Sequence, residues 1–403
     1  MRGKNMQNDV LTLTRDQERA IDMAMRGGNL NILGASGTGK SVLVRELVRR
    51  MENQGKKVYT TATTGIAADH INGHTLNRVL GTFNGRITDK TDFEMSADRI
   101  KDADVIIIDE VSMMTPMICE YLKMTLEHVN KSVQIIPVGD FKQLGPVLCD
   151  YVFTCKAWKE LGFNYIELQE VIRQKDAMDK DFLRRVSEGE YDKDYFDNYL
   201  EKNTSDTEFH DDIYLCPTND QMRIVNAEKT DLLPGRGITF IADCDSGLDF
   251  KSVPLEKRLL VKRHMPVMAQ INDRKGRFKN GSRGIVLDIN ETRREVIVDF
   301  EKTGITVVTY TDIPYETENK EYIISQIPLR PAYASTIHKS QGQTFERINV
   351  FYDRCTYPGQ FYTALSRSVS LNNIHLMGKV NRYNFTVSPE VLSFYKTVRA
   401  KAA

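Results

Sequence analysis

Short apolar runs recur along the chain, and several are followed by stretches whose apolar residues return with helical spacing. The runs at residues 30–33, 105–108 and 133–138 are typical of strands buried on both faces of a sheet. The stretch after the first run has its apolar residues at Val42, Leu43, Val44, Leu47 and Val48. Strands that alternate with helices predict an α/β fold built on parallel strands.

Capping residues mark where several helices begin or end. Thr14 is the predicted N-cap of a helix that leads toward the first apolar run, and Thr115 followed by Pro116 predicts another helix start. Gly189 is predicted to end a helix that carries Phe182, Leu183 and Val186.

A second α/β half is predicted past residue 150. Its expected strands lie at residues 165–168, 213–216 and 348–351, and residues 389–401 form an amphipathic closing helix.

Two stretches depart from this alternation. Residues 78–103 are weakly patterned, with Phe83 and Phe93, and predict a small subdomain inserted between parallel strands. Residues 259–327 combine Pro, Gly and short alternating runs, which predict a small β barrel inserted into the second half. The loop at 272–279 is the most basic cluster, and its Phe278 is either a nucleic-acid contact or part of a solvated hairpin tip.

Charge and cysteine usage narrow the class of protein. The 403 residues contain 55 Lys+Arg and 55 Asp+Glu, so any affinity for DNA has to come from local clusters. The six cysteines are scattered, which argues against structural zinc and for buried thiols in a reducing compartment. The polar start of the chain and the short apolar runs predict neither a signal peptide nor a membrane span, and hence a cytoplasmic location.

The first apolar run breaks into glycines and ends at a Lys-Ser pair. Its spacing fits the P-loop, in which backbone N–H groups cradle phosphates, the lysine neutralises β/γ oxygens and the hydroxyl ligates Mg²⁺. A Gly/Ser-rich turn before an ordinary helix is the alternative, and the helical spacing that follows favours the phosphate loop. The predicted nucleotide and Mg²⁺ site comprises Gly34, Ala35, Ser36, Gly37, Thr38, Gly39, Lys40 and Ser41.

Polar residues follow the next two predicted strands. Asp109 ends a fully apolar strand and is expected to hold Mg²⁺, with Glu110 beside the attacking water. Because ligands bind at the carboxyl ends of strands in open α/β sheets, Gln143 in the loop at 139–147 is expected to sense the γ-phosphate or to orient the water. Considered alone, this glutamine would be a surface-loop residue.

Hydroxyl side chains mark a second anion-binding stretch. Thr63 and Thr64 lie between a predicted strand at 57–60 and a helix start, a setting in which hydroxyls and helix N-terminal amides hold nucleic-acid phosphates. His74 and Thr75 follow closely and could touch the same DNA strand. A routine strand-to-helix turn is the alternative.

Taken in order, these motifs resemble the superfamily 1B DNA helicases, and most of all their PIF and RecD-like branch, from about residue 11 to 378. The residues that carry the resemblance are Gln17, Gly34 to Ser41, 63–68, 108–110, 139–144, 171–174, 338–342 and 364–367. One departure is the short Lys131-Ser132-Val133 stretch, where PIF members carry a longer basic segment.

The resemblance implies a two-domain ATPase. Two RecA-like P-loop NTPase domains would hold ATP between them, with a Src-homology-3-like β barrel inserted into the second. The first domain would comprise residues 1–155, with a wedge at about 78–103. The second would comprise 156–258 and 328–403, and the barrel would comprise 259–327.

The resemblance also implies a role for each motif residue. Gln17, whose amide can both donate and accept, would read adenine. Lys40 and Ser41 would bind phosphates and Mg²⁺, Asp109 the metal and Glu110 the water. Gln143, Arg173 and Arg367 would contact the γ-phosphate, the arginines from a second domain as the cleft closes. The residues facing DNA would be Thr63, Thr64, His74, Thr75 and Ser340.

The expected protein is an ATP-dependent DNA helicase that moves 5′→3′ as a monomer on single-stranded DNA and single/double-strand junctions. It would serve DNA replication, repair or recombination near the nucleoid of a bacterial or phage-infected cell. Two other classes stay open: a P-loop kinase of a small molecule, and a single-strand-binding recombination mediator that uses ATP as a switch. Motif spacing by itself does not determine the direction of movement.

Overall fold

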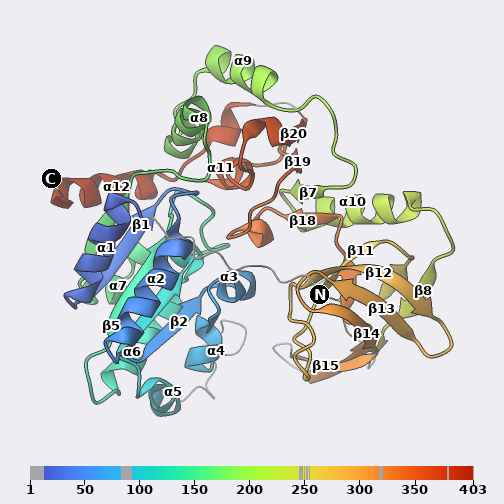
Figure 1. The fold of residues 1–403 in the computed structure, drawn as a ribbon, viewed down its shortest axis with the longest axis horizontal. Helices are drawn as coiled ribbons and strands as arrows, with labels where there is room; N and C mark the ends of the chain where they lie inside the picture. The colour runs from blue at the N-terminus through green and yellow to red at the C-terminus, as the bar shows by residue number, and fades with distance from the viewer. Residues whose placement is uncertain are drawn as a thin grey trace, which may run out of the picture. The chain divides into compact units, whose positions relative to one another are not determined.

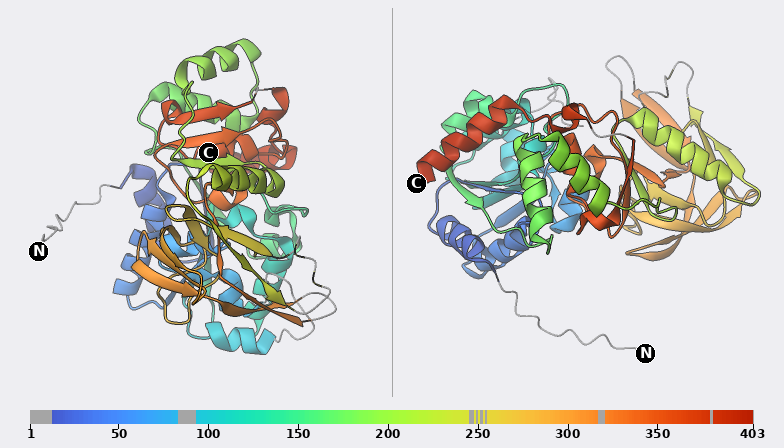
Figure 2. Two further views of the ribbon diagram at one scale, coloured as in Figure 1. Left: turned by 90° about the vertical axis from the view of Figure 1, so that its right-hand side faces the viewer. Right: turned by 90° about the horizontal axis from the view of Figure 1, so that it is seen from above.

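A computed structural model describes residues 13–82, 93–244, 248, 250, 253, 255–316, 321–378 and 381–402 (Figures 1 and 2). The expectations for the polar N-terminus and for Phe83 lie outside these residues. The chain divides into two compact units. Unit 1 comprises Met1–Tyr191, Tyr357–Ser366 and Phe385–Ala403, and unit 2 comprises Asp192–Thr356 and Arg367–Asn384.

Unit 1 is built on six strands paired in parallel, in the order β3-β2-β4-β5-β1-β6. The strands are β1 (Leu30–Gly34), β2 (Val58–Ala62), β3 (His74–Thr75), β4 (Val105–Asp109), β5 (Gln134–Gly139) and β6 (Asn164–Leu168). All residues of β1, β4 and β5 are buried. The three apolar runs are therefore confirmed as strands covered on both faces.

Helices cover both faces because successive strand residues point to opposite sides. Val105 and Ile107 pack with the helices α1 (Arg15–Met25), α2 (Lys40–Asn53) and α3 (Gly65–His70), and Figure 1 shows α1 and α2 over one face of the sheet. Ile106 and Ile108 pack on the opposite side with α4 (Leu76–Leu80), α5 (Phe93–Ile100), α6 (Pro116–Glu127), α7 (Lys156–Glu160) and α12 (Pro389–Ala402). Unit 1 also contains α8 (Ala177–Glu188) and α11 (Gln360–Leu365).

The predicted helix caps are confirmed. Thr14 forms a capping box with Gln17 at the start of α1, and Thr115 caps α6 with Pro116 in its first turn. α8 ends at Gly189, which has a φ of 71° and so adopts the left-handed conformation that glycine accepts without strain.

Unit 1 extends past residue 155, where the sequence placed a domain boundary. β6 pairs with β1 from Leu30↔Asn164 to Gly34↔Leu168, which brings the segment up to Tyr191 into the first sheet's unit. Helix α12, expected in the second domain, buries Val391, Tyr395 and Val398 in the same core as Trp158. The difference arises from long-range pairing and packing.

Unit 2 contains a four-stranded parallel sheet in the order β18-β7-β19-β20. Its strands are β7 (Ile213–Cys216), β18 (Ala334–Thr336), β19 (Ile348–Phe351) and β20 (Ile374–Met377), and its helices include α9 (Lys193–Asn203) and α10 (Asn219–Leu232). The strands predicted at 213–216 and 348–351 are confirmed.

The other sheets that the described residues of unit 2 form are antiparallel. One sheet contains β11 (Pro266–Ala269), β12 (Arg283–Asn290), β13 (Glu295–Phe300), β14 (Gly304–Thr309) and β17 (Leu329–Pro331). The other two contain β8 (Ile238–Ile241), β9 (Asp243–Cys244), β10 (Arg258–Val261), β15 (Thr311–Glu316) and β16 (Glu321–Gln326). This β region begins at β8, before the expected residue 259. Short 3₁₀ helices lie at Val111–Met113, Val152–Thr154, His338–Ser340, Leu371–Asn373 and Arg382–Phe385.

Phe278 does not present its ring at the tip of the basic loop. The side chain is 3% exposed and lies in the β core, where its ring stacks on Phe300 at 5.1 Å between centroids. Arg277 is held by Asp273 at 2.7 Å. The nucleic-acid contact predicted for this ring is therefore wrong, because its apolar surface is more stable in the core than in water. The solvated hairpin tip is confirmed for the basic residues of the loop, which are exposed.

The prediction that the cysteines are buried thiols is confirmed only in part. Cys119, Cys216 and Cys355 are buried, Cys155 and Cys244 are half-buried and Cys149 is exposed, all as free thiols. Within the described part of the chain, the helices are too short or too polar to cross a membrane.

Candidate nucleotide-binding site

The loop between β1 and α2 has the backbone of a phosphate cradle. Gly37 and Gly39 have φ values of 86° and 76°, where a side chain would be strained. The Lys40 ammonium donates to the carbonyl oxygens of Gly34 at 2.8 Å and Ala35 at 3.0 Å. The hydroxyl of Thr38 also donates to Ala35 O, at 2.9 Å. The lysine thus lies inside the loop it is predicted to serve, and Ser41 follows in the first turn of α2.

Gln17 fastens this loop to α1. Its Nε2 donates to Thr38 O at 3.0 Å, and its Oε1 accepts from the Thr14 backbone N–H at 2.9 Å. A Cβ atom added at Gly39 would lie 2.5 Å from Gln17 Nε2, so a side chain there would displace the Gln17 amide in addition to straining the backbone at its φ of 76°. Reading of adenine by Gln17 stays a prediction.

Carboxylates converge on the lysine from the ends of β4 and β5. Burial lowers the pKa of Lys40, whereas the charges of Asp140, Glu110 and Asp109 raise it. Burial and then the charge of Glu110 raise the pKa of Asp109 well above its ordinary value. Glu110 has a φ of 52°, an unusual backbone conformation of the kind that clusters at functional sites.

Asp140, which the sequence did not single out, is the hydrogen-bonding centre of the loop that bears Gln143. Its Oδ1 accepts from the Lys142 backbone N–H and the Tyr395 hydroxyl, both at 3.1 Å. Its Oδ2 accepts from the Tyr362 hydroxyl at 3.1 Å and from Gln143 Nε2 at 3.4 Å. Gln143 is 3% exposed, so it is not a surface-loop residue.

Arg173 lies in the same unit as the phosphate loop, whereas the sequence placed it in the second domain. Its backbone N–H donates to Gly37 O at 3.0 Å, and Nη1 donates to Ser36 Oγ at 3.0 Å and to Ser366 O at 2.8 Å. Burial lowers its pKa, against the charges of Tyr362 and Glu110. The pairing of β6 with β1 is what carries Arg173 to the loop.

Arg367 belongs to unit 2, as the sequence predicted for an arginine from a second domain. Its side chain is 2% exposed, and its Nη1 donates to Gln343 O at 3.3 Å. The structure therefore describes this arginine only within unit 2, and its contact with the γ-phosphate stays a prediction.

The predicted DNA-facing hydroxyls all have partners within the protein. Thr63 Oγ1 donates to Glu110 O at 2.8 Å, which ties this residue to the acidic pair. Thr64 and Thr75 cap α3 and α4, and His74 is exposed on β3. Ser340 is fully buried, and its hydroxyl donates to Ile337 O at 2.7 Å. The contacts of these side chains with DNA stay predictions.

Lys339, next to Ser340, gives a pH-dependent prediction. Burial, then the charges of Arg330 and Arg223, lower its pKa to about 8. The folded state therefore carries the full cost of this cation below pH 8, and stability rises as pH increases from 8 toward the unfolded pKa. Lys339→Met should raise the free energy of unfolding by ~1–2 kcal/mol at pH 7, less at pH 9.5, measured by urea unfolding.

The exposed Lys202 on α9 provides the control, since Lys202→Met should change stability by less than about 0.5 kcal/mol at either pH. An effect of Lys339→Met that is independent of pH would contradict the burial argument.

The donor set suits a hard divalent cation. The Ser41 hydroxyl and the Asp109 carboxylate are oxygen donors of the kind that Mg²⁺ prefers when it also binds phosphates. A buried carboxylate with a raised pKa is moreover one that a bound cation would stabilise. These residues fit Mg²⁺.

Comparison with known proteins agrees with the sequence resemblance. A family model described as an AAA domain matches residues 12–205. The chain is 31% identical to the ATP-dependent DNA helicase Pif1 of Bdellovibrio bacteriovorus over 96% of this chain and 92% of that protein. It is 29% identical to the ATP-dependent DNA helicase PIF1 of Xenopus laevis over 98% of this chain, and spans only 65% of that relative. The crystal structure of the Candida albicans Pif1 helicase matches 96% of this chain and 100% of its own, with a TM-score of 0.81 and 25% identity.

Proposed function

Because the chain belongs to the Pif1 family of DNA helicases, we propose that it hydrolyses ATP to move along single-stranded DNA and to unwind duplex DNA. The observation that carries this proposal is the buried convergence of Lys40, Asp109, Glu110 and Asp140 at one edge of the unit 1 sheet. A lysine inside a phosphate loop, with carboxylates facing it, suits binding and hydrolysis of a nucleoside triphosphate.

Each residue then has a role in binding ATP or directing water. Lys40 and the loop N–H groups bind the phosphates, Gln17 reads the adenine and Glu110 accepts a proton from the attacking water. Ser41 and Asp109 hold Mg²⁺, which when bound neutralises phosphate charge. Gln143 and Arg173 contact the γ-phosphate from unit 1, and Arg367 contributes from unit 2.

The proposed direction of movement is 5′→3′, on single-stranded DNA and at single/double-strand junctions, by a protein that works as a monomer in DNA replication, repair or recombination. Thr63, Thr64, His74, Thr75 and Ser340 belong to the elements that would meet the DNA. Holding phosphates rather than base edges would make the movement independent of sequence.

The first experiment measures ATP turnover of the full chain with and without single-stranded DNA. Stimulation by DNA is the expected result, and its absence would contradict a motor function. Phosphorylation of a small molecule without DNA would instead favour a P-loop kinase. Slow turnover with tight DNA binding and no strand separation would favour an ATP-switched mediator.

The second experiment compares unwinding of duplexes that carry either a 5′ or a 3′ single-stranded tail. We expect strand separation from the 5′-tailed substrate. A preference for the 3′ tail would overturn the proposed direction and leave the proposed ATP chemistry standing.

A further inference from the structure

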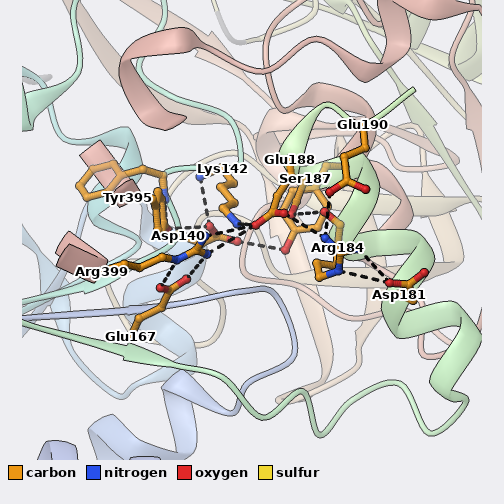
Figure 3. A network of polar contacts seen from close by, with 12 residues as sticks. Asp140, Lys142, Glu167, Asp181, Arg184, Ser187, Glu188, Glu190, Tyr395 and Arg399 are labelled. Carbon is orange, nitrogen blue, oxygen red and sulfur yellow. Dashed lines mark hydrogen bonds and ion pairs between the residues drawn. The ribbon is translucent and has the colours of Figure 1, made fainter. Parts of the chain in front are cut away.

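Helix α12 reaches the nucleotide site through the hydroxyl of Tyr395. Figure 3 shows the side chains of Tyr395 and Arg399 extending from this helix toward Asp140 and Glu167. The Tyr395 hydroxyl donates to Asp140 Oδ1 at 3.1 Å and accepts from the Phe141 backbone N–H at 3.3 Å. Burial and the charge of Asp140 raise the pKa of Tyr395 well above its ordinary value, which keeps the hydroxyl a donor.

Asp140 connects Tyr395 by hydrogen bonds to both the phosphate loop and Gln143. The Tyr362 hydroxyl donates to Asp140 Oδ2 and accepts from the Ser36 backbone N–H at 2.9 Å. Gln143 Nε2 donates to the same oxygen. One carboxylate therefore joins the phosphate loop, the Gln143 side chain and α12, all within unit 1.

Ion pairs and aromatic contacts hold α12 in this place. Arg399 binds Glu167 through two contacts of 2.8 Å and pairs at 3.5 Å with Glu188, which also pairs with Lys142 at 3.0 Å (Figure 3). The ammonium of Lys142 lies 4.9 Å from the centre of the Tyr395 ring. Phe394 adds apolar packing, since its ring stacks on Phe153 with centroids 4.3 Å apart. A bidentate arginine pair and a packed aromatic restrict the helix more than a single surface ion pair would.

A cavity of about 270 Å³ borders these residues. It is lined by side chains from the phosphate loop, the Asp140 loop, α8, α11 and α12, among them Ser36, Asp140, Lys142, Tyr362, Tyr395 and Arg399. A volume of this size holds several water molecules. If the Tyr395 hydroxyl were removed, Asp140 Oδ1 would lose the donor that comes from α12 and keep the Lys142 backbone N–H, and water could enter in place of the hydroxyl.

We propose that Tyr395 and Asp140 are positioning residues for ATP hydrolysis, through which α12 sets the orientation of Gln143. The proposal rests on the proposed function, because it assigns Gln143 to the γ-phosphate. Neither residue is expected to touch ATP: Tyr395 holds Asp140, and Asp140 holds the Gln143 amide and, through Tyr362, the phosphate loop.

The test is Tyr395→Phe in the full chain, which removes one hydroxyl and keeps the ring in the core. We expect kcat for DNA-stimulated ATP hydrolysis to fall about five- to tenfold, with KM for ATP changed less than about twofold. In a Gln143→Ala background the same substitution should lower kcat less than about twofold, because the group it positions is already absent.

The matched control is Tyr165→Phe. Tyr165 also packs against Phe394, and its hydroxyl accepts from Trp158 Nε1 at 3.3 Å, away from Asp140. Its removal should leave kcat unchanged. If Tyr395→Phe does not fold, Asp140→Asn, which keeps the shape and replaces one acceptor by a donor, should show the same selective loss of kcat.

Three results would overturn this proposal: an unchanged kcat in Tyr395→Phe, an equal loss in Tyr165→Phe, or a full further loss in the Gln143→Ala background. The kcat of each variant is compared with that of the wild-type protein, after Lys40→Ala has shown that turnover in the wild type requires Lys40. Absence of ATP turnover in the wild type would contradict the proposed function itself.

Discussion

Lys40→Ala should lower DNA-stimulated ATP turnover by about 10²- to 10³-fold and remove duplex unwinding. Lys40 is only 9% exposed, and its ammonium lies within 3.0 Å of two loop carbonyl oxygens, so it is already placed where phosphates would enter. Alanine removes the cation without changing the loop glycines. Phosphate charge would then meet Asp109 and Glu110 with one fewer positive group nearby.

The measurement is steady-state ATP turnover at saturating single-stranded DNA, alongside thermal unfolding. Lys159, an exposed lysine on α7, supplies the control, since Lys159→Ala removes the same charge from the surface of the same unit. The control should keep wild-type turnover. A loss below about tenfold in Lys40→Ala, in a folded protein, would mean that ATP is bound elsewhere.

The central sheet of unit 1 was predictable because its signals are local. β4 and β5 are apolar runs buried on both faces, and α2 begins where the glycines of the phosphate loop end. Thr14 and Thr115 each cap a helix by accepting a hydrogen bond from a backbone N–H three residues further along the chain. A reader needs only neighbouring residues to place these elements.

The boundary between the units was not predictable in this way. The pairing of β6 with β1 joins residues more than a hundred positions apart, and nothing in residues 164–168 states which sheet they enter. The consequence for the site is large, because Arg173 follows β6 directly. Sequence order suggested an arginine from a second domain, whereas strand register brings it to Gly37 and Ser36.

Asp140 and Tyr395 show the same limit within the site. The loop after β5 was recognised, but its aspartate is defined by donors from α11 and α12, more than two hundred residues downstream. In the sequence, Tyr395 was recognisable only as an apolar position on an amphipathic helix. The hydrogen bond from its hydroxyl to Asp140 could not be predicted from that pattern. The prediction for Phe278 was wrong in the opposite sense. Its basic neighbours suggested that the ring is exposed, whereas the ring belongs to the β core.

The placement of Arg173 leads to the second large effect that we expect. Arg173→Ala should lower kcat by about 10³-fold, the range for an arginine that stabilises charge at a transferring phosphoryl group. Its two side-chain contacts, Ser36 Oγ and Ser366 O, both lie in unit 1 with Lys40. Turnover without DNA and turnover with DNA should therefore fall by the same factor.

Arg173→Lys separates charge from geometry. A lysine keeps the positive charge but lacks the planar fork, so it should recover at most about tenfold of the loss. Arg49→Ala is the control and should leave kcat unchanged, because Arg49 pairs with Glu46 on the exposed side of α2. A loss in Arg173→Ala confined to DNA-stimulated turnover would mean that this arginine acts through the response to DNA, against its place beside the phosphate loop.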